Sequence, residues 1–154
     1  MILKRFFKIG PGEYGEGDIF IGVKVPEIRV VAKRYMGLNL AVVEKLLSSS
    51  VHEERLTALL ILVLKFNMSE EDEKRRIFRL YLKNTKHINN WDLVDLSANR
   101  IVGEYLMDKD KNVLYKLTAS RSIWERRISM LSAFQFIKES RFSEAFKFRG
   151  VVIG

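Results

Sequence analysis

The chain has 154 residues, which suits one domain, and 47% of them are hydrophobic, which is enough for a packed core. Lys and Arg outnumber Asp and Glu by 27 to 19, and the resulting net charge of +8 favours an anionic partner such as nucleic acid. The sequence contains no cysteine and only two histidines. Disulfides, thiolate metal sites and cysteine nucleophiles are therefore excluded, a histidine-based metal site is nearly excluded, and we expect no cofactor.

The hydropathy pattern predicts a protein without a membrane partner. The longest strongly apolar run, from Leu56 to Leu64, is far shorter than a bilayer span. The N-terminus has no long apolar stretch and no small-residue cleavage site, so no secretory signal is recognised. The lack of cysteine also fits a reducing compartment. We therefore expect a cytoplasmic protein.

The remaining pattern is helical. Glycines cluster in the first two dozen residues and predict a loop over about 10–24. Pro26, at a first helical position, and Gly37, where a helix would stop, then delimit the first helix. Capping residues mark the later starts, and the predicted helices span about 26–36, 40–48, 51–66, 70–86, 91–107, 111–119 and 123–139.

The start signals are of two kinds. Asn39, Asn89 or Asn90, and Asp110 are single N-cap residues. Three other starts carry a hydroxyl residue followed three positions later by an acid, the pattern of a capping box: Ser50 with Glu53, Ser69 with Asp72, and Ser122 with Glu125.

The spacing of these caps indicates repeated helix pairs. Ser50, Asn89 or Asn90, and Ser122 lie about 32 to 40 residues apart, which is the length of helical-pair repeats. No segment shows convincing strand alternation, although residues 18–25 are extended enough to pair briefly. We predict a single all-α domain over 1–154, built of stacked antiparallel helix pairs. A globular helix bundle is the alternative.

Basic residues form a stripe on one predicted helix. Six of them and no acid lie between positions 74 and 86, and four share one face: Arg75, Arg79, Lys83 and Lys86. A second basic group further along includes Arg126 and Arg127. A continuous positive surface attracts a phosphate backbone through counterion release, without reading sequence. The pattern favours DNA or RNA binding, and a solvated helix face is the alternative.

One pair of residues suits chemistry on a cation. Trp91 and Asp95 are four apart, so both project over the same face of a helix. An aromatic plate beside a carboxylate holds a cation and stabilises developing positive charge. The alternative is structural, because acids favour the first turn of a helix and tryptophan is usually buried. His52 and His87 are expected at the surface or at helix caps.

Several separated motifs carry a family resemblance. They are Phe6–Asp18, Gly22–Pro26, Asn89–Asp95, Gly103–Leu106 and Ile123–Arg127. In this order they resemble the AlkD-type DNA alkylation repair family, over about residues 4–147. The resemblance implies HEAT-like helix pairs in a curved α-solenoid with a concave, basic, DNA-binding face. It also implies a glycosylase, a hydrolase of N-glycosidic bonds, that releases cationic alkylpurines such as 3-methyladenine and 7-methylguanine from double-stranded DNA.

The resemblance also assigns roles residue by residue. Trp91 would be an aromatic wall, Asp95 the catalytic carboxylate, and Arg127 a contact to the DNA backbone. Trp124 matches a motif but is expected to pack between repeats. Base flipping is the usual glycosylase device, yet this resemblance implies no binding pocket for an extruded base. The alternative function is a non-catalytic HEAT-like module that binds DNA or protein.

The ends of the chain differ from the pattern of the family. Members of the family carry a helical segment before the Phe-Phe-Lys motif and further repeats after the last one here, including another tryptophan. On this basis we expect a partial solenoid, truncated at both ends, with weak activity because a second aromatic wall is missing. A solenoid cut within its array exposes an apolar face. We therefore expect self-association through an edge containing Phe142, Phe146 and Phe148.

Overall fold

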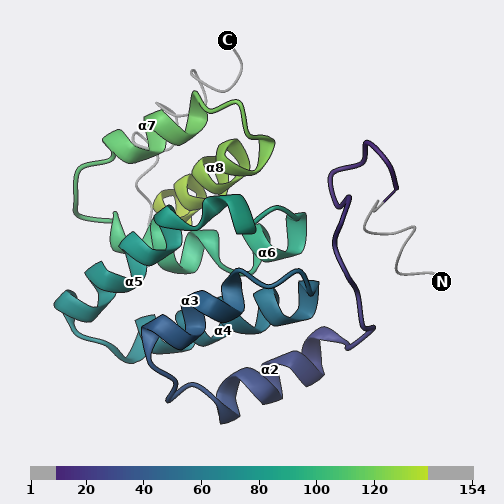
Figure 1. Cartoon of the computed structure of the whole chain (residues 1–154). Helices are drawn as coiled ribbons and strands as arrows, with labels where there is room; N and C mark the ends of the chain where they lie inside the picture. Colours follow the sequence, from purple (N-terminus) through teal and green to yellow (C-terminus); the bar gives the residue numbers. More distant parts are fainter. Residues whose placement is uncertain (1–9, 139–154) are drawn as a thin grey trace.

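The computed structural model describes residues 10–138, and this part of the chain is helical (Figure 1). No strand occurs between residues 10 and 138; the extended segment forms one parallel β-bridge, between Ile19 and Val51. The prediction of an all-α fold is confirmed. The helices are α2 (Val25–Arg34), α3 (Leu40–Leu47), α4 (His52–Met68), α5 (Glu71–Lys83), α6 (Trp91–Asp95), α7 (Asn112–Thr118) and α8 (Ile123–Lys138).

The helices stack in successive tiers from α2 at one end to α7 and α8 at the other (Figure 1). α3 packs along α4, and α7 packs along α8. This arrangement is compatible with the predicted solenoid of helix pairs. The segment 10–24 runs along one side of the stack, past α6 (Figure 1). None of the helices in residues 10–138 is both long and apolar enough to cross a membrane.

α4 is the central element of the core. It contacts α2, α3, α5 and α6, so its apolar side chains are needed on more than one face. Eight of its apolar and aromatic side chains are buried, and they include Leu56, Leu59, Ile61, Leu62 and Phe66. The apolar run that is too short for a membrane span is therefore the centre of the hydrophobic core.

The two asparagine caps are confirmed. The Asn39 side chain accepts a hydrogen bond from the backbone N–H of Val42 at 3.0 Å, at the start of α3. Asn90 accepts from the N–H of Trp91 at 2.8 Å, at the start of α6. These caps form because each asparagine needs only a neighbour in sequence. The predicted cap at Asp110 is wrong: the N-cap position of α7 is Lys111, without a side-chain cap, and Asp110 accepts from the N–H of Asn112 at 2.9 Å from one residue further out.

The predicted capping boxes at α4 and α5 are wrong. α4 is preceded by Val51, with no side-chain cap, and the Glu53 carboxylate accepts from the backbone N–H groups of Ile21 and Gly22. Ser69 donates its hydroxyl hydrogen to the carbonyl of Lys65 at 2.6 Å instead of capping α5. At α4 the Glu53 carboxylate, and at α5 the Ser69 hydroxyl, forms its hydrogen bond with a group outside the first turn of the helix.

The box at α8 forms only in part. The backbone N–H of Glu125 donates to Ser122 Oγ at 3.4 Å. The Glu125 carboxylate, however, accepts from the hydroxyl groups of Thr85 and Ser120. The N–H of Ser122 donates to Ser120 Oγ at 3.0 Å. Glu125 therefore ties α8 to the short 3₁₀ turn Thr85–His87.

The single helix predicted over 91–107 is broken. α6 ends at Asp95, and a π-helical segment, Asn99–Gly103, follows it. The Ser97 hydroxyl lies between, 2.5 Å from the carbonyl of Leu93 and 2.8 Å from the Tyr81 hydroxyl. Such a bond to the carbonyl four residues earlier bends helices. The break leaves Asp95 at a helix end facing α8.

The last turns of α8 present an apolar surface. Phe134 and Ile137 are 50% and 39% exposed. The expected edge at Phe142, Phe146 and Phe148 lies outside the described residues. Self-association stays a prediction.

Gly103 is sensitive to added volume, because the π-helical segment approaches α8 closely at this residue. A Cβ atom on Gly103 would lie 2.7 Å from the backbone oxygen of Ser132 and 2.9 Å from Gln135 Cβ. Overpacking of this kind costs about 1 to 3 kcal/mol. We expect Gly103→Ala to lower the free energy of unfolding by that amount in urea denaturation.

Gly37→Ala is the matched control for this substitution. A Cβ on Gly37 meets no atom within 4 Å. Its effect should stay within about 0.5 kcal/mol, as for most surface substitutions. Equal stability of the two variants would contradict the tight contact between the π-helical segment and α8.

Candidate functional site

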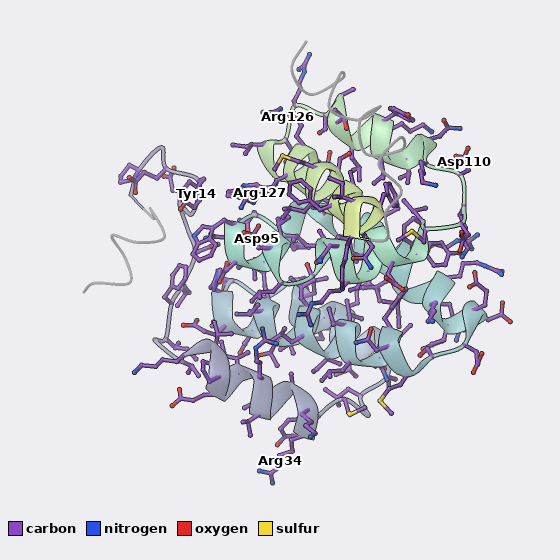
Figure 2. All side chains as sticks on the ribbon, turned by 180° about the vertical axis from the view of Figure 1, so that it is seen from behind. Tyr14, Arg34, Asp95, Asp110, Arg126 and Arg127 are labelled. Atoms are coloured by element: carbon purple, nitrogen blue, oxygen red, sulfur yellow. The ribbon has the colours of Figure 1, made fainter. Side chains whose placement is uncertain are left out.

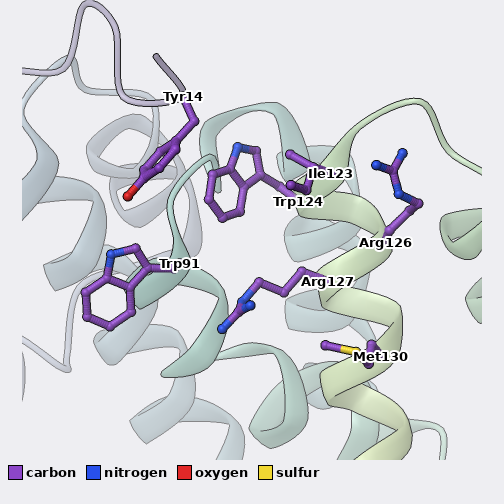
Figure 3. Close-up of a pocket in the computed structure, with 7 residues that line it drawn as sticks. All are labelled: Tyr14, Trp91, Ile123, Trp124, Arg126, Arg127 and Met130. Carbon is purple, nitrogen blue, oxygen red and sulfur yellow. The ribbon is translucent and has the colours of Figure 1, made fainter. Parts of the chain in front are cut away.

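A hollow of about 380 Å³ lies where the segment 10–24 meets the first turns of α6 and α8 (Figure 3). We call it the aromatic pocket. Its lining is mostly aromatic and apolar, with two guanidinium groups: Tyr14, Trp91, Ile123, Trp124, Arg126, Arg127 and Met130. Three elements that are distant in sequence therefore build one site.

The pocket has aromatic side chains from each of these three elements. Tyr14 and Trp124 meet edge to face, with ring centroids 5.2 Å apart and planes at 73°, an arrangement that aromatic quadrupoles favour. Trp91 comes from α6 (Figure 3). Trp124 packs against the core, as expected, but it also lines the pocket. Tyr14 and Trp124 thus supply aromatic surface that we expected this chain to lack.

Burial and charge keep Tyr14 neutral. Its pKa is raised, first by burial and then by the negative charges of Glu13 and Asp92. The phenol is therefore protonated at neutral pH. An uncharged ring keeps its quadrupole and its O–H donor, and both suit contact with a cation or a polar sugar.

Asp95 joins the pocket through an ion pair with Arg127. The guanidinium binds both carboxylate oxygens, Nε to Oδ1 and Nη2 to Oδ2, each at 2.7 Å. Such bidentate pairs are the strong form of the charged hydrogen bond. The hydrogen bond to Asp95 raises the pKa of Arg127. The two side chains are 32% and 34% exposed, so solvent and ligands reach both groups.

The structure brings together four of the eight predicted site residues. Trp91 and Asp95 share α6, and Arg127 reaches them from α8, a separation of 32 residues. Arg126 lines the pocket too, and its guanidinium donates to the backbone oxygens of Ser120 and Arg121. Arg126 and Arg127 lie side by side on α8, at the end of the molecule opposite Arg34 (Figure 2).

The stripe on α5 lies elsewhere. Arg75 and Arg79 line a separate hollow of about 570 Å³ together with acids of the first turn of α5. Arg75 pairs with Asp72 at 3.3 Å, and Lys83 pairs with Glu44 of α3 at 2.9 Å. Lys86 is exposed. Acids from another turn and another helix therefore offset part of the positive charge that the sequence pattern shows.

A buried charged network lies beside the pocket, and sequence reasoning missed it. His52 is only 2% exposed, so the expectation that it lies at the surface or at a cap is wrong. Its Nε2 is 2.7 Å from Asp92 Oδ2, and its Nδ1 is 3.7 Å from Asp18 Oδ2. Arg55 Nη2 donates to the same oxygen of Asp18 at 2.7 Å. The one local signal was the three-residue spacing of His52 and Arg55, which places them on one helix face.

The network shifts two pKa values in opposite directions. Burial alone would lower the pKa of His52, but the carboxylates of Asp18 and Asp92 outweigh it and raise that pKa above its ordinary value. Burial alone would raise the pKa of Asp18, but His52 and Arg55 outweigh it and lower that pKa. Protonated His52 between two carboxylates is therefore the favoured state. Among the described residues, no cluster of acids and histidines suits a metal ion.

Comparison with known proteins adds the family. No curated protein and no solved structure matches the chain significantly. The family model for DNA alkylation repair enzymes matches residues 1–151, a range that contains every residue of the aromatic pocket and of the buried network. Because the match extends over nearly the whole sequence, the chain belongs to the DNA alkylation repair enzyme family.

Proposed function

We propose that this protein is a DNA glycosylase that hydrolyses the N-glycosidic bond of cationic alkylpurines, such as 3-methyladenine and 7-methylguanine, in double-stranded DNA. The observation that carries the proposal is the oriented carboxylate of Asp95 at the edge of an aromatic pocket. Family membership supports DNA as the partner.

The chemistry needs little acid catalysis. Alkylation of a ring nitrogen gives the purine a positive charge, so the base leaves as a neutral molecule with the electron pair of the glycosidic bond. The sugar then develops oxocarbenium character, and water attacks its anomeric carbon and releases one proton to the solvent. A carboxylate near that carbon stabilises charge that appears mainly in the transition state. Asp95 supplies the carboxylate, and the rings of Trp91, Trp124 and Tyr14 attract the cationic nucleotide.

Arg127 gives the carboxylate its orientation. Two bonds of 2.7 Å hold both oxygens of Asp95, so the carboxylate needs no reorganisation when charge develops. The guanidinium also lines the pocket, where a phosphate of bound DNA would compete for it. A phosphate that draws Arg127 toward itself leaves more of the negative charge of Asp95 for the sugar.

One observation favours a non-catalytic DNA- or protein-binding module instead. Arg127 occupies both oxygens of Asp95, and Arg127 rather than Asp95 contributes to the lining of the pocket. If that pair persists on DNA, the site recognises a backbone and does no chemistry. Release of a free base separates the two functions.

The catalytic assignment predicts a ranked loss of activity. Asp95→Asn removes a preorganised charge, which commonly costs about 100- to 1,000-fold in rate. Trp91→Ala removes one cation–π contact of roughly 0.5 to 2 kcal/mol, equivalent to about 2- to 30-fold. The measurement is single-turnover release of 7-methylguanine from methylated duplex DNA.

The control for Asp95→Asn must be an exposed acid, because replacing a buried acid would also destabilise the fold. Asp92 is unsuitable, because it is 4% exposed and hydrogen-bonded to His52. Asp72→Asn is the matched control: the side chain is 91% exposed on α5, and its loss adds the same unit of positive charge. We expect the parent rate for it. Equal rates for Asp95→Asn and the parent would end the catalytic assignment, and DNA binding without base release by the parent would favour the module.

DNA binding is predicted to be independent of sequence and sensitive to salt. Each phosphate contact contributes a slope of about −0.9 to the logarithm of the binding constant against the logarithm of salt concentration. Arg126→Gln and Arg127→Gln should each reduce the slope by about that amount. Arg79→Gln tests whether the stripe on α5, with Arg75 and Lys83, and the neighbouring Lys86 of the 3₁₀ turn also contact DNA.

Arg34→Gln is the control for the salt experiment, because Arg34 lies at the opposite end of the molecule from Arg126 (Figure 2). It removes the same charge and should leave the slope unchanged. The measurement is fluorescence anisotropy of unmodified duplex DNA at several salt concentrations. A binding constant that does not change with salt, or equal slopes for the Arg34 and Arg126 variants, would refute a backbone contact at the pocket.

A further inference from the structure

Two of the three aromatic side chains of the pocket, Tyr14 and Trp91, belong to elements that both contact one side chain, His52. Tyr14 stands four residues before Asp18, and Trp91 stands immediately before Asp92. His52 of α4 contacts both of these carboxylates. A change at one buried ring is therefore transmitted to the segment that carries Tyr14 and to the helix that carries Trp91.

We propose that His52 is a positioning residue: its protonated ring bridges Asp18 and Asp92, holds Tyr14 and Trp91 around the aromatic pocket, and lets the pocket loosen when it gives up a proton. The inference rests on the geometry of the pocket and not on glycosylase chemistry. It makes the binding surface of this protein sensitive to pH.

The geometry favours a proton on both ring nitrogens: Nε2 hydrogen-bonds Asp92, and Nδ1 lies within ion-pair distance of Asp18. Nε2 lies 2.7 Å from Asp92 Oδ2 and Nδ1 lies 3.7 Å from Asp18 Oδ2, and both carboxylates are 6% exposed. Neutral histidine has one N–H donor and one lone pair. In the neutral state one nitrogen would therefore turn a lone pair toward a buried carboxylate, which is repulsive where little water screens it.

Among the described residues that pair around this ring, the charges balance when His52 is protonated. Asp18 comes from the N-terminal segment, Asp92 from α6, and Arg55 from α4; with the imidazolium, two negative and two positive groups sum to zero. Loss of the proton leaves one net negative charge in a buried site, and such a charge is costly. Glu53 on α4 is held separately, by the backbone N–H groups of Ile21 and Gly22.

Contacts that do not depend on the proton of His52 keep the segment 10–24 attached to α4. The ring of His52 stacks on Phe20 with centroids 4.4 Å apart. Backbone bonds join Ile19 to Ser50 and His52, at 3.1 and 2.8 Å, and do not depend on the proton. A cavity of about 300 Å³ lined by Phe20, His52 and Asp92 gives water a place to enter when the ion pair weakens. The segment therefore stays attached while Tyr14 gains freedom.

The direction of the pH effect follows from the shifted pKa values. The pKa of His52 is raised in the folded protein, so its contribution is complete below the ordinary value of 6.5 and is lost as the pH rises through the folded value. The pKa of Asp18 is lowered, so its contribution is complete above the ordinary value of 3.8 and is lost only at more acidic pH. The aromatic side chains of the pocket are therefore held in place in mild acid and become more mobile toward alkaline pH.

The sequence supplies the reporters for a direct test. Its two tryptophans, Trp91 and Trp124, both line the pocket, so intrinsic tryptophan fluorescence reads the pocket itself. We expect acrylamide quenching of the intact protein to increase with pH, with one inflection above pH 6.5. His52→Gln, which keeps a hydrogen-bond donor but cannot titrate, should abolish the inflection. His87→Gln, which removes the other histidine, should leave it unchanged.

Nuclear magnetic resonance assigns the titration to a residue. Two imidazole signals are expected, and His52→Gln identifies them. His52 should titrate above its ordinary value and His87 below it, because burial, Lys86 and Arg55 lower the pKa of His87. The midpoint of the fluorescence change should coincide with that of His52.

Asp18→Asn covers the case in which His52→Gln does not fold. It keeps the ring and removes one carboxylate, so the His52 midpoint and the fluorescence midpoint should move together to lower pH. An inflection that survives His52→Gln, or flat fluorescence while His52 titrates, would overturn the proposal. None of these readouts needs base excision, so failure of the glycosylase assignment would leave the result intact.

Discussion

Charged groups that leave water must be paired, and this constraint organises the site. Asp18, Asp92 and Arg55 are nearly buried around His52, and each has an opposite charge within 2.7 Å. Removing one partner from such a set is strongly destabilising. The pairing therefore fixes the extended segment 10–24, through Asp18, against α4 and α6. Tyr14 lies in the pocket as a consequence, and the aromatic pocket depends on a network that no substrate needs to touch.

The same competition for partners explains which local patterns predicted the fold. Asn39 and Asn90 cap their helices because each cap needs only a neighbouring backbone N–H. Glu53 fits a capping box in sequence, yet backbone donors more than 30 residues away take its carboxylate. Periodicity also missed the break after Asp95, because the bend depends on Ser97 and its long-range bond to Tyr81. Long-range partners thus overrode the local signals at Glu53 and Ser97, whereas at Ser69 a bond to the nearby carbonyl of Lys65 replaced the expected cap.

The site was predictable to the extent that its residues share one helix. Trp91 and Asp95 were singled out by their four-residue spacing and Arg127 as part of a basic group, and the roles of all three came only from resemblance to a family. Tyr14 was missed as a wall because its contact with Trp124 joins a loop to a helix more than 100 residues later. The stripe on α5 shows the opposite failure. Its basic residues do share a face, but Glu44 belongs to another helix, and helical spacing cannot reveal an acid that folding brings alongside.

The site contains a buried set of ion pairs around His52 and an exposed ion pair between Asp95 and Arg127. The difference in exposure gives them different roles. Asp18 and Asp92, each 6% exposed, cannot exchange His52 for a ligand without opening the segment that covers them. Asp95 and Arg127 are about one third exposed, so a phosphate can approach the guanidinium without unfolding anything. A protein that binds a polyanion needs both properties together. The buried network holds the segment 10–24 against α4 and α6, and the exposed pair of Asp95 and Arg127 can exchange partners without opening that network.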